Sequence, residues 1–321
     1  MKLFSTCPIC GKSPRATFRG KIAVDRYQGA MRKVAEDYLE LGHDTHPEEV
    51  VSVCGGCRAL YRAKFFDEKE VEAIYGSLYR DLEAKLEGDV DFAYDNAEFK
   101  DGCAASALKL VKDVERRHEI AVKDVFDVGG RDGFRLKALA AAGYRCSVFD
   151  PIDKPVCDSR IRKTRCWSHE IPEDEKADMI LLCNVLEHSI DPHGLIRDCF
   201  KHLRDGGFLY VELPSDIETV FDWLAFGRWR KANLMIDHTH HVFYSKKSVM
   251  HLLGKTGFEI AACGFSRLPV INVTVLETLG RKTASATRPR LRGVSLDYDL
   301  VASGHFPRLF GRALRKVFKA A

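Results

Sequence analysis

The sequence predicts an α/β protein in which helices cover both faces of a largely parallel sheet, preceded by a small cysteine-rich module. Three observations lead to this fold class. Between residues 104 and 280, short apolar runs alternate with segments of helical periodicity, which is typical of strands joined by crossover helices. A glycine-rich turn at 129–133 connects the first of these runs to a helix. Two Cys-x-x-Cys pairs lie near the N-terminus, outside the alternating region.

The composition is that of a globular protein. Of 321 residues, 45% are hydrophobic and 30% are charged, which excludes a disordered, collagen-like or coiled-coil chain. The longest apolar run, Met179–Cys183, is far shorter than the roughly 20 residues that span a bilayer. The N-terminus has no long apolar stretch or small-residue cleavage site, so we expect no secretory signal. These features predict a cytoplasmic protein.

The N-terminal module, residues 1–75, carries two metal-binding knuckles. Each pair has two residues between its thiols and a glycine close by, so a tight turn can direct both sulfurs at one ion. Four thiolates suit tetrahedral zinc and leave no position for water, which predicts a structural ion. The alternative is two unrelated pairs of buried cysteines. The predicted zinc ligands are Cys7, Cys10, Cys54 and Cys57.

Two helices are predicted around the second knuckle. Apolar residues at helical spacing indicate one over 27–41. The other covers 67–76, where Asp67 is the expected N-cap and acidic residues occupy the first turn. The acidic, polar stretch that follows predicts a linker or entrance segment over 76–103.

The stretch 124–150 predicts a nucleotide-binding half-sheet. An apolar strand ending at Val128 leads into the glycine turn and a helix, and the next strand, from Arg145, ends in Asp150. A dinucleotide site would need glycine where Arg131 stands, and Asp132 would lie against the pyrophosphate. Both residues count against a dinucleotide, and the acid favours a cofactor with cationic sulfonium and amino groups, namely S-adenosylmethionine.

The downstream elements continue the same pattern. A buried strand over 177–183 runs into a polar loop, and Asp191-Pro192 opens a helix that ends near 203. The remaining predicted elements are a strand at 208–214, a helix at 246–255, and strands at 258–264 and 270–276.

The segment from about 104 to 278 resembles the class I S-adenosylmethionine-dependent methyltransferases. The matching motifs are DVGGRDG, VFDP, ADMILLCNVLEHSIDP, LRDGGFLYVELP and HVFYSKKSVMHLLGKTGFEI, in family order. The knuckles and the segment DEKEVEAIYGSLYRD are similar to an elaboration found in sugar C-methyltransferases. The resemblance implies a Rossmann-like seven-stranded sheet over 104–280, with helices on both faces and a zinc-ribbon-like module before it. Arg131, where most members have glycine, is the departure from the pattern.

The resemblance also implies roles for individual residues. The turn glycines would wrap the methionine part of the cofactor, Asp127 would face its amino group, and Asp150 would hold the ribose hydroxyls. Asn184 and the loop after it would line the side from which methyl is transferred. The expected cofactor-binding residues are Asp127, Gly129, Gly130, Gly133, Asp150 and Asn184.

The insertion 215–244 is the expected acceptor region. It ends with the cluster His238, His240 and His241, for which three interpretations stay open. His240 or His241 can act as a general base, because the imidazole pKa is near neutral. His238 and His240 can instead contribute to a second metal site, or all three can be structural. The sequence lacks an Asn-Pro-Pro-Tyr motif after the fourth strand, which counts against methylation of a base or amide nitrogen.

The tail, 281–321, is strongly basic, with ten Lys or Arg against two Asp. Residues 306–319 predict a short amphipathic helix with a basic face. Such a helix suits peripheral contact with the inner membrane surface, a partner groove, or docking on the protein itself. Nucleic acid is the least favoured partner, because the whole chain has a net charge of only +4.

These inferences predict methyl transfer to a small or carrier-linked acceptor, such as a sugar or glycolipid precursor. One alternative is an RNA or protein methyltransferase that docks through the zinc module and the basic tail. Another is a non-catalytic scaffold with the methyltransferase fold, in which residues such as Arg131 close the cofactor pocket.

Overall fold

The computed structural model describes residues 2–21, 48–73, 96–215, 240–267 and 274–283. Several sequence predictions lie outside these ranges. They are the helix at 27–41, most of the 76–103 linker, most of the 215–244 insertion including His238, and the amphipathic segment 306–319. Among the described residues, no helix is long and apolar enough to cross a membrane.

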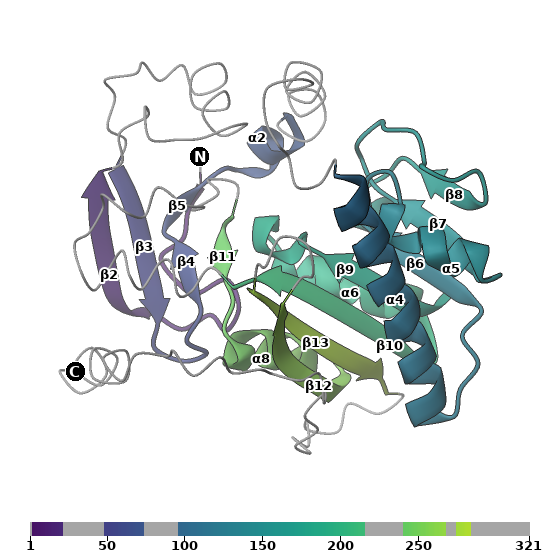
Figure 1. The fold of residues 1–321 in the computed structure, drawn as a ribbon. Coiled ribbons are helices and arrows are strands. Elements are labelled where there is room, and N and C mark those ends of the chain that lie inside the picture. Colours follow the sequence, from purple (N-terminus) through teal and green to yellow (C-terminus); the bar gives the residue numbers. More distant parts are fainter. Residues whose placement is uncertain (1, 22–47, 74–95, 216–239, 268–273, 284–321) are drawn as a thin grey trace.

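A seven-stranded sheet forms the larger part of the molecule, as the sequence predicts (Figure 1). Its strand order is β12-β13-β10-β9-β6-β7-β8. The neighbours from β10 to β8 are parallel, whereas β13 runs antiparallel to both β10 and β12. The strands are β6 Asp124–Val128, β7 Arg145–Phe149, β8 Ile161–Thr164, β9 Ala177–Cys183, β10 Leu203–Pro214, β12 Phe258–Arg267 and β13 Thr274–Lys282.

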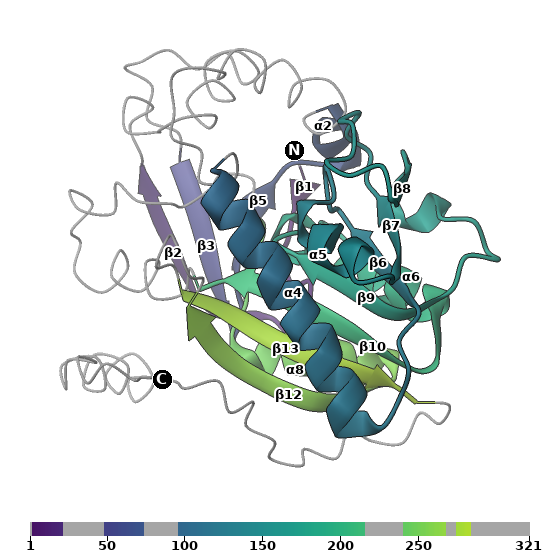
Figure 2. The ribbon, with the colours of Figure 1, turned by 45° about the vertical axis from the view of Figure 1, so that its right-hand side comes forward.

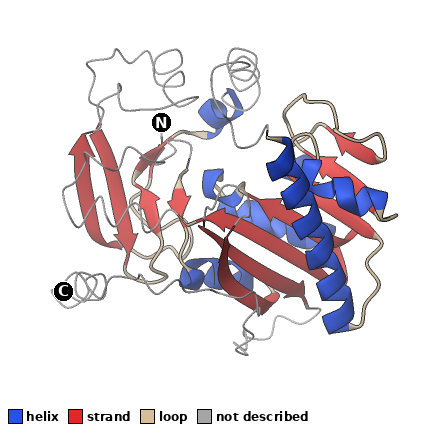
Figure 3. Cartoon of the chain, viewed as in Figure 1, coloured by secondary structure: helices blue, strands red, loops and turns tan. Residues whose placement is uncertain are grey.

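Helices cover both faces of this sheet (Figures 2 and 3). Helices α4, Ala97–His118, and α5, Lys137–Ala141, pack on one face, and α6, Pro192–His202, and α8, Lys246–Thr256, pack on the other. Successive strand residues point to opposite faces. In β9, Met179 therefore belongs to the α4 and α5 cluster and Ile180 to the α6 and α8 cluster.

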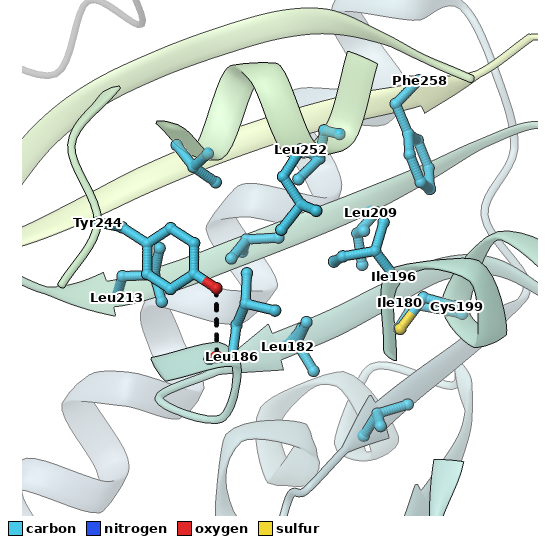
Figure 4. Close-up of a cluster of buried hydrophobic side chains, with 14 of the residues drawn as sticks. Ile180, Leu182, Leu186, Ile196, Cys199, Leu209, Leu213, Tyr244, Leu252 and Phe258 are labelled. Carbon is cyan, nitrogen blue, oxygen red and sulfur yellow. Dashed lines mark hydrogen bonds between the residues drawn. The ribbon is translucent and has the colours of Figure 1, made fainter. Parts of the chain in front are cut away.

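The core between the sheet and helices α6 and α8 is shown in Figure 4. Ile180 and Leu182 of β9 face Ile196 of α6 and Leu252 of α8, with Phe258 at the edge. Tyr244, the last residue of the acceptor region, is buried in the same cluster, and its hydroxyl donates to the carbonyl of Leu186 at 3.4 Å. The loop after β9 is thus anchored to the core.

The four-cysteine module forms a second, four-stranded sheet in the order β11-β4-β3-β2. Its strands are β2 Pro14–Lys21, β3 Glu48–Cys54, β4 Leu60–Arg62 and β11 Val242–Phe243. A separate pair joins β1, Lys2–Leu3, to β5, Lys64–Phe65. Strand β11 comes from the second half of the sequence and pairs with β4, so the smaller sheet combines strands from both halves of the chain (Figure 1).

The cap of the helix after the second knuckle is confirmed. Helix α2 spans Glu68–Ala73, and residues 74–76 of the predicted 67–76 helix lie outside the described residues. Asp67 Oδ1 accepts from the amide of Glu70 at 3.1 Å, and Glu70 accepts from the amide of Asp67 at 2.8 Å. This reciprocal pair is a capping box, which satisfies amides that have no partner within the helix.

Two predicted boundaries are wrong. Helix α4 begins at Ala97, not 104, because Asn96 caps it and Phe99 and Cys103 are buried, so 97–103 is not linker. The last strand extends to Lys282 and does not end at 276. Arg281 and Lys282 therefore belong to β13 and not to the basic tail; Lys282 Nζ donates to the carbonyl of Leu203 at 2.7 Å.

Candidate functional site

The sheet order reverses between β6 and β9, since successive strands from β6 extend to one side and those from β9 to the other. In open α/β sheets, ligands bind beyond the carboxyl ends of the strands at such a reversal. Asp127 lies near the end of β6, Asp150 directly follows β7, and Asn184 directly follows β9. The fold therefore brings the predicted acids and amide to one edge, together with the glycine turn.

The glycine turn leaves no space for side chains at two positions. Gly129 has φ +75°, and a Cβ there would lie 2.5 Å from Cγ2 of Val185. A Cβ on Gly130 would overlap the carboxylate of Asp127. The main chain of the turn, called the cradle below, therefore lies directly against the Asp127 carboxylate, a close approach that only residues without a side chain allow.

Arg131 fits the turn although it replaces the usual glycine. Its φ is +50°, a left-handed conformation that costs a non-glycine residue roughly 1–2 kcal/mol. Its amide donates to Asp150 Oδ2 at 2.9 Å, and its carbonyl accepts from Lys163 Nζ at 2.7 Å. These bonds hold the backbone in the shape that the turn requires.

Asp150 is 2% exposed, and burial raises the pKa of its carboxyl above the ordinary value. Oδ2 accepts from Arg131, and Oδ1 accepts from the amide of Ile152 at 2.7 Å. An ionised carboxylate has about four acceptor positions, so these two amide donors leave capacity for ribose hydroxyls.

Asp127 is 1% exposed, and its Oδ2 has no hydrogen-bond partner among the described residues. Burial raises its pKa to about 7, an effect that Arg135 opposes and the nearby Asp150 strengthens. A buried carboxylate oxygen without a donor is costly. A cationic amino group in the cradle would supply the missing donor, so the residues fit the amino end of S-adenosylmethionine.

Asn184 is held by a buried ion pair that the sequence analysis missed. Its Nδ2 donates to Glu212 Oε1 at 3.2 Å, and its amide donates to the carbonyl of the same residue at 2.9 Å. Glu212 in turn pairs with Arg135 at 2.6 Å. In the sequence, a single glutamate inside the apolar strand FLYVELP indicates such an ion pair, because buried charges are normally paired.

The acceptor side holds a second cluster that sequence reasoning recognised only in part. Glu187 Oε1 lies 3.8 Å from His188 Nε2 and 4.0 Å from His240 Nε2, and the two imidazole rings are 4.7 Å apart. The three ligand atoms lie within 4.8 Å of one another. Glu187 is the acid that was not evident beside the histidines in the sequence. His238 lies outside the described residues.

His241 has a different environment from His240. Its ring stacks on Phe65, at 4.6 Å and 11°, and packs against Phe4 at 4.2 Å. Its Nδ1 contacts the carbonyl of Ser189 at 3.3 Å, and burial lowers its pKa to about 4. These contacts favour a packing role for His241 and leave His240 as the histidine beside Glu187.

The four predicted zinc ligands come together. Cys10 and Cys54 have their sulfurs 3.2 Å apart, and Cys7 and Cys57 have theirs 3.6 Å apart. All four ligand atoms lie within 4.8 Å of one another. Tetrahedral zinc with bonds of about 2.3 Å would hold sulfurs about 3.8 Å apart. The cluster therefore fits a zinc ion with a complete thiolate shell, which suits a structural site.

The knuckle backbone also supports the sulfurs. The amide of Ile9 donates to Cys7 Sγ at 3.4 Å, and the amide of Gly56 donates to Cys54 Sγ at 3.2 Å. A hydrogen bond from Cys57 is the main cause that lowers the pKa of Cys7, to about 7. A thiol with this pKa is readily deprotonated, and the thiolate is the form that binds a metal.

Comparison with known proteins supports the assignment of the central region. The model of a methyltransferase domain family matches residues 103–262. The mitochondrial ubiquinone biosynthesis O-methyltransferase of Bos taurus is 27% identical over 156 residues, covering 42% of this chain and 41% of that protein. The ubiquinone biosynthesis O-methyltransferase of Nitrosospira multiformis is 23% identical over 202 residues, covering 59% of this chain and 83% of that protein. The chain thus spans about two fifths of the bovine protein's length.

A solved structure gives the same fold. The 1,6-didemethyltoxoflavin-N1-methyltransferase of Burkholderia thailandensis, with bound S-adenosylhomocysteine, has a TM-score of 0.50 and 15% identity, covering 73% of this chain and 96% of that one. The residues that the family model matches include the glycine turn, Asp127, Asp150 and Asn184. Residues 103–262 are therefore a methyltransferase domain of the S-adenosylmethionine-dependent family, in a chain that also carries a four-cysteine module.

Proposed function

We propose that this protein transfers a methyl group from S-adenosylmethionine to a hydroxyl of a small or carrier-linked acceptor, such as a sugar or a glycolipid precursor. One observation carries the proposal. The buried Oδ2 of Asp127, which has no hydrogen-bond partner among the described residues, faces a cradle that a side chain on Gly130 would fill. A cationic amino group satisfies this oxygen with a charge-assisted hydrogen bond, which is stronger than a bond from a neutral donor.

Each cofactor-binding residue has a defined task in this proposal. Asp127 accepts from the amino group, and Gly129, Gly130 and Gly133 let the main chain wrap the methionine part. Asp150 accepts the ribose hydroxyls beyond the end of β7. Asn184, held by Glu212, lines the side that faces the acceptor.

The reaction needs a base and alignment in addition to the cofactor. S-Adenosylmethionine supplies an electrophilic methyl carbon on sulfur, which keeps the C–S electron pair when the acceptor oxygen takes the methyl group. His240 removes the hydroxyl proton, and the adjacent Glu187 stabilises the imidazolium that results. His241 is proposed to pack and not to act as the base.

Oxygen is proposed as the acceptor atom for two reasons. Both relatives described above are named as O-methyltransferases. The segment Asn184-Val-Leu-Glu187 also differs from the Asn-Pro-Pro-Tyr motif expected for methylation of a base or amide nitrogen. The amphipathic segment 306–319 lies outside the described residues, and its contact with a membrane or carrier stays a prediction.

Cofactor binding is tested by calorimetry with S-adenosylhomocysteine. We expect wild-type protein to bind it and Asp150→Ala to lose about 10–100-fold in affinity, since charge-assisted hydrogen bonds contribute about 1.5–3 kcal/mol. The exposed Asp153, three residues away, provides the matched control as Asp153→Ala. No binding by the wild type would contradict the proposal and favour the scaffold.

Methyl transfer is tested with labelled S-adenosylmethionine and a panel of hydroxylated acceptors that includes sugar nucleotides. His240→Gln should lower turnover about 10²–10⁴-fold, as expected for loss of a general base. Its affinity for S-adenosylhomocysteine should equal that of the wild type. Equal turnover in the wild type and His240→Gln would exclude His240 as the base.

A further inference from the structure

The zinc module is part of the same sheet as the segment that carries the proposed base. Strand β4 begins three residues after Cys57, and the amide of Cys54 donates to the carbonyl of Ala59 at 2.9 Å. On its other side, β4 pairs with β11, with Tyr61 opposite Val242 and Leu60 opposite Phe243. A continuous hydrogen-bonded path therefore runs from the knuckle to the residues directly after His241.

Arg62, at the end of β4, holds the two residues before β11. Its side chain is buried, and Nε donates to the carbonyl of His240 at 2.9 Å. Its amide donates to the carbonyl of His241 at 3.0 Å. Consecutive carbonyls of the acceptor segment are thus fixed by one residue of the zinc module.

The opposite side of this segment is fixed by the loop after β9. The amide of His241 donates to the carbonyl of Glu187 at 2.7 Å, and its Nδ1 contacts the carbonyl of Ser189. The His241 ring is packed by Phe4 and Phe65, which both belong to the module. His240 is therefore held between Arg62 and the loop that carries Glu187 and His188.

We propose that Arg62 is a positioning residue for His240, and that metal loading of the module sets the geometry of the acceptor side without setting cofactor affinity. The inference rests on the proposed function, which assigns His240 as the general base. The cofactor residues Asp127, Asp150 and Asn184 follow strands β6, β7 and β9 or lie in them, and no hydrogen bond within the described part of the chain joins them to the module. The two halves of the site can consequently be disturbed separately.

The charge of Arg62 alone is not sufficient for this role. The Nε–H of arginine donates in the plane of a rigid guanidinium, whereas lysine has a single flexible ammonium at the end of its stem. Arg62→Lys keeps the charge and most of the volume but removes the donor aimed at the His240 carbonyl. The exposed Arg15 on β2 provides the matched control, as Arg15→Lys.

The first measurement is the imidazole proton resonance of His240 across a pH titration, identified by its absence in His240→Gln. We expect its titration curve to shift in Arg62→Lys and after removal of zinc from the wild type with a chelator. The exposed His169 serves as an internal reference and should not shift. A general loss of folded structure would instead shift many proton resonances, including that of His169.

The second measurement is hydrogen exchange of the segment 240–244, combined with binding of S-adenosylhomocysteine. Exchange there should become about tenfold faster in Arg62→Lys and in the chelated wild type, since a tenfold change corresponds to about 1.4 kcal/mol, the scale of one hydrogen bond. Affinity for S-adenosylhomocysteine should stay within about twofold, well below the effect of one hydrogen bond. Zinc content of Arg62→Lys should equal that of the wild type.

Each contrary result has a distinct meaning. Unchanged His240 titration and exchange in both Arg62→Lys and zinc-free protein would overturn the positioning role. An equal loss of S-adenosylhomocysteine affinity would overturn the separation of the two halves. Wild-type protein that binds no S-adenosylhomocysteine would contradict the proposed function, while the exchange result would still decide whether Arg62 and zinc hold the segment.

Discussion

Arg135 and Glu212 form an ion pair of 2.6 Å that is almost completely buried beneath the cofactor side of the sheet. Glu212 also receives a hydrogen bond from Asn184 at 3.2 Å, and the Tyr210 hydroxyl lies 3.3 Å from its other oxygen. The same hydroxyl donates to Glu277 on β13 at 2.6 Å. The pair therefore connects the glycine turn, the loop after β9 and two neighbouring strands.

Removing one partner of this pair should be strongly destabilising. Arg135→Met leaves the Glu212 carboxylate buried without its cation, and breaking such a pair costs about 3–5 kcal/mol of unfolding free energy. Urea denaturation measures this loss. The control is Lys137→Met, which removes an exposed pair with Asp101 and should change the unfolding free energy only slightly. Similar losses of unfolding free energy in both variants would contradict a larger contribution from the buried pair.

The cradle should tolerate no side chain at Gly130. A methyl group there would displace the Asp127 carboxylate, so Gly130→Ala should lose the charge-assisted bond to the cofactor amino group. We expect S-adenosylhomocysteine to bind about 10–100-fold more weakly, measured by calorimetry. Gly264→Ala is the control, because a Cβ at that position meets nothing within 4 Å. Unchanged affinity in Gly130→Ala would place the amino group elsewhere.

Cofactor affinity should depend on pH through Asp127. Its pKa of about 7 means that the free carboxyl is protonated below neutral pH, whereas the cationic amino group requires the carboxylate. Binding then releases a proton, and affinity should fall by about tenfold per pH unit as the pH drops below about 7. Calorimetry in buffers of different ionisation enthalpy detects the proton.

The variant Asp127→Asn separates this effect from other titrations. It should bind S-adenosylhomocysteine weakly, with an affinity independent of pH in the same range. The free energy of unfolding has the opposite pH dependence, because burial raises the pKa of Asp127 on folding. The penalty for the buried charge is present above about pH 7 and is relieved as the pH falls toward the ordinary value of 3.8. A wild-type pH profile identical to that of Asp127→Asn would be inconsistent with the assignment.

His241 should make the fold sensitive to acid. Its pKa falls from 6.5 to about 4 on folding, so between these values the unfolded chain takes up a proton that the folded chain excludes. Unfolding free energy should therefore fall with decreasing pH through this window, by up to about 1.4 kcal/mol per pH unit. His241→Phe, which keeps a ring between Phe4 and Phe65, should flatten that dependence in urea denaturation. His169→Phe at an exposed position is the comparison, and an equally steep profile in His241→Phe would refute the prediction.

Features encoded by local spacing could be predicted from the sequence. The knuckle cysteines, the glycine turn and the acid after β7 depend on residues that are close in the chain, so their order predicted the fold class and most cofactor-side residues. The start of α4 could not be predicted, because Phe99 and Cys103 lie in a polar stretch and only their burial makes it helical. The role of Glu212 could not be predicted either, because its partner Arg135 is 77 positions away and the two residues meet only in the folded chain.

The sequence by itself determined the two metal knuckles and the strand–turn–helix unit, because backbone geometry and side-chain periodicity act over a few residues. Tertiary structure decided which distant groups meet: Glu187 with His240, Glu212 with Arg135, and β4 with β11. It also gave the adjacent His240 and His241 different surroundings, one beside a carboxylate and the other between phenylalanines. Burial and strand pairing are properties of the folded chain, and they set the pKa and the contacts of each side chain.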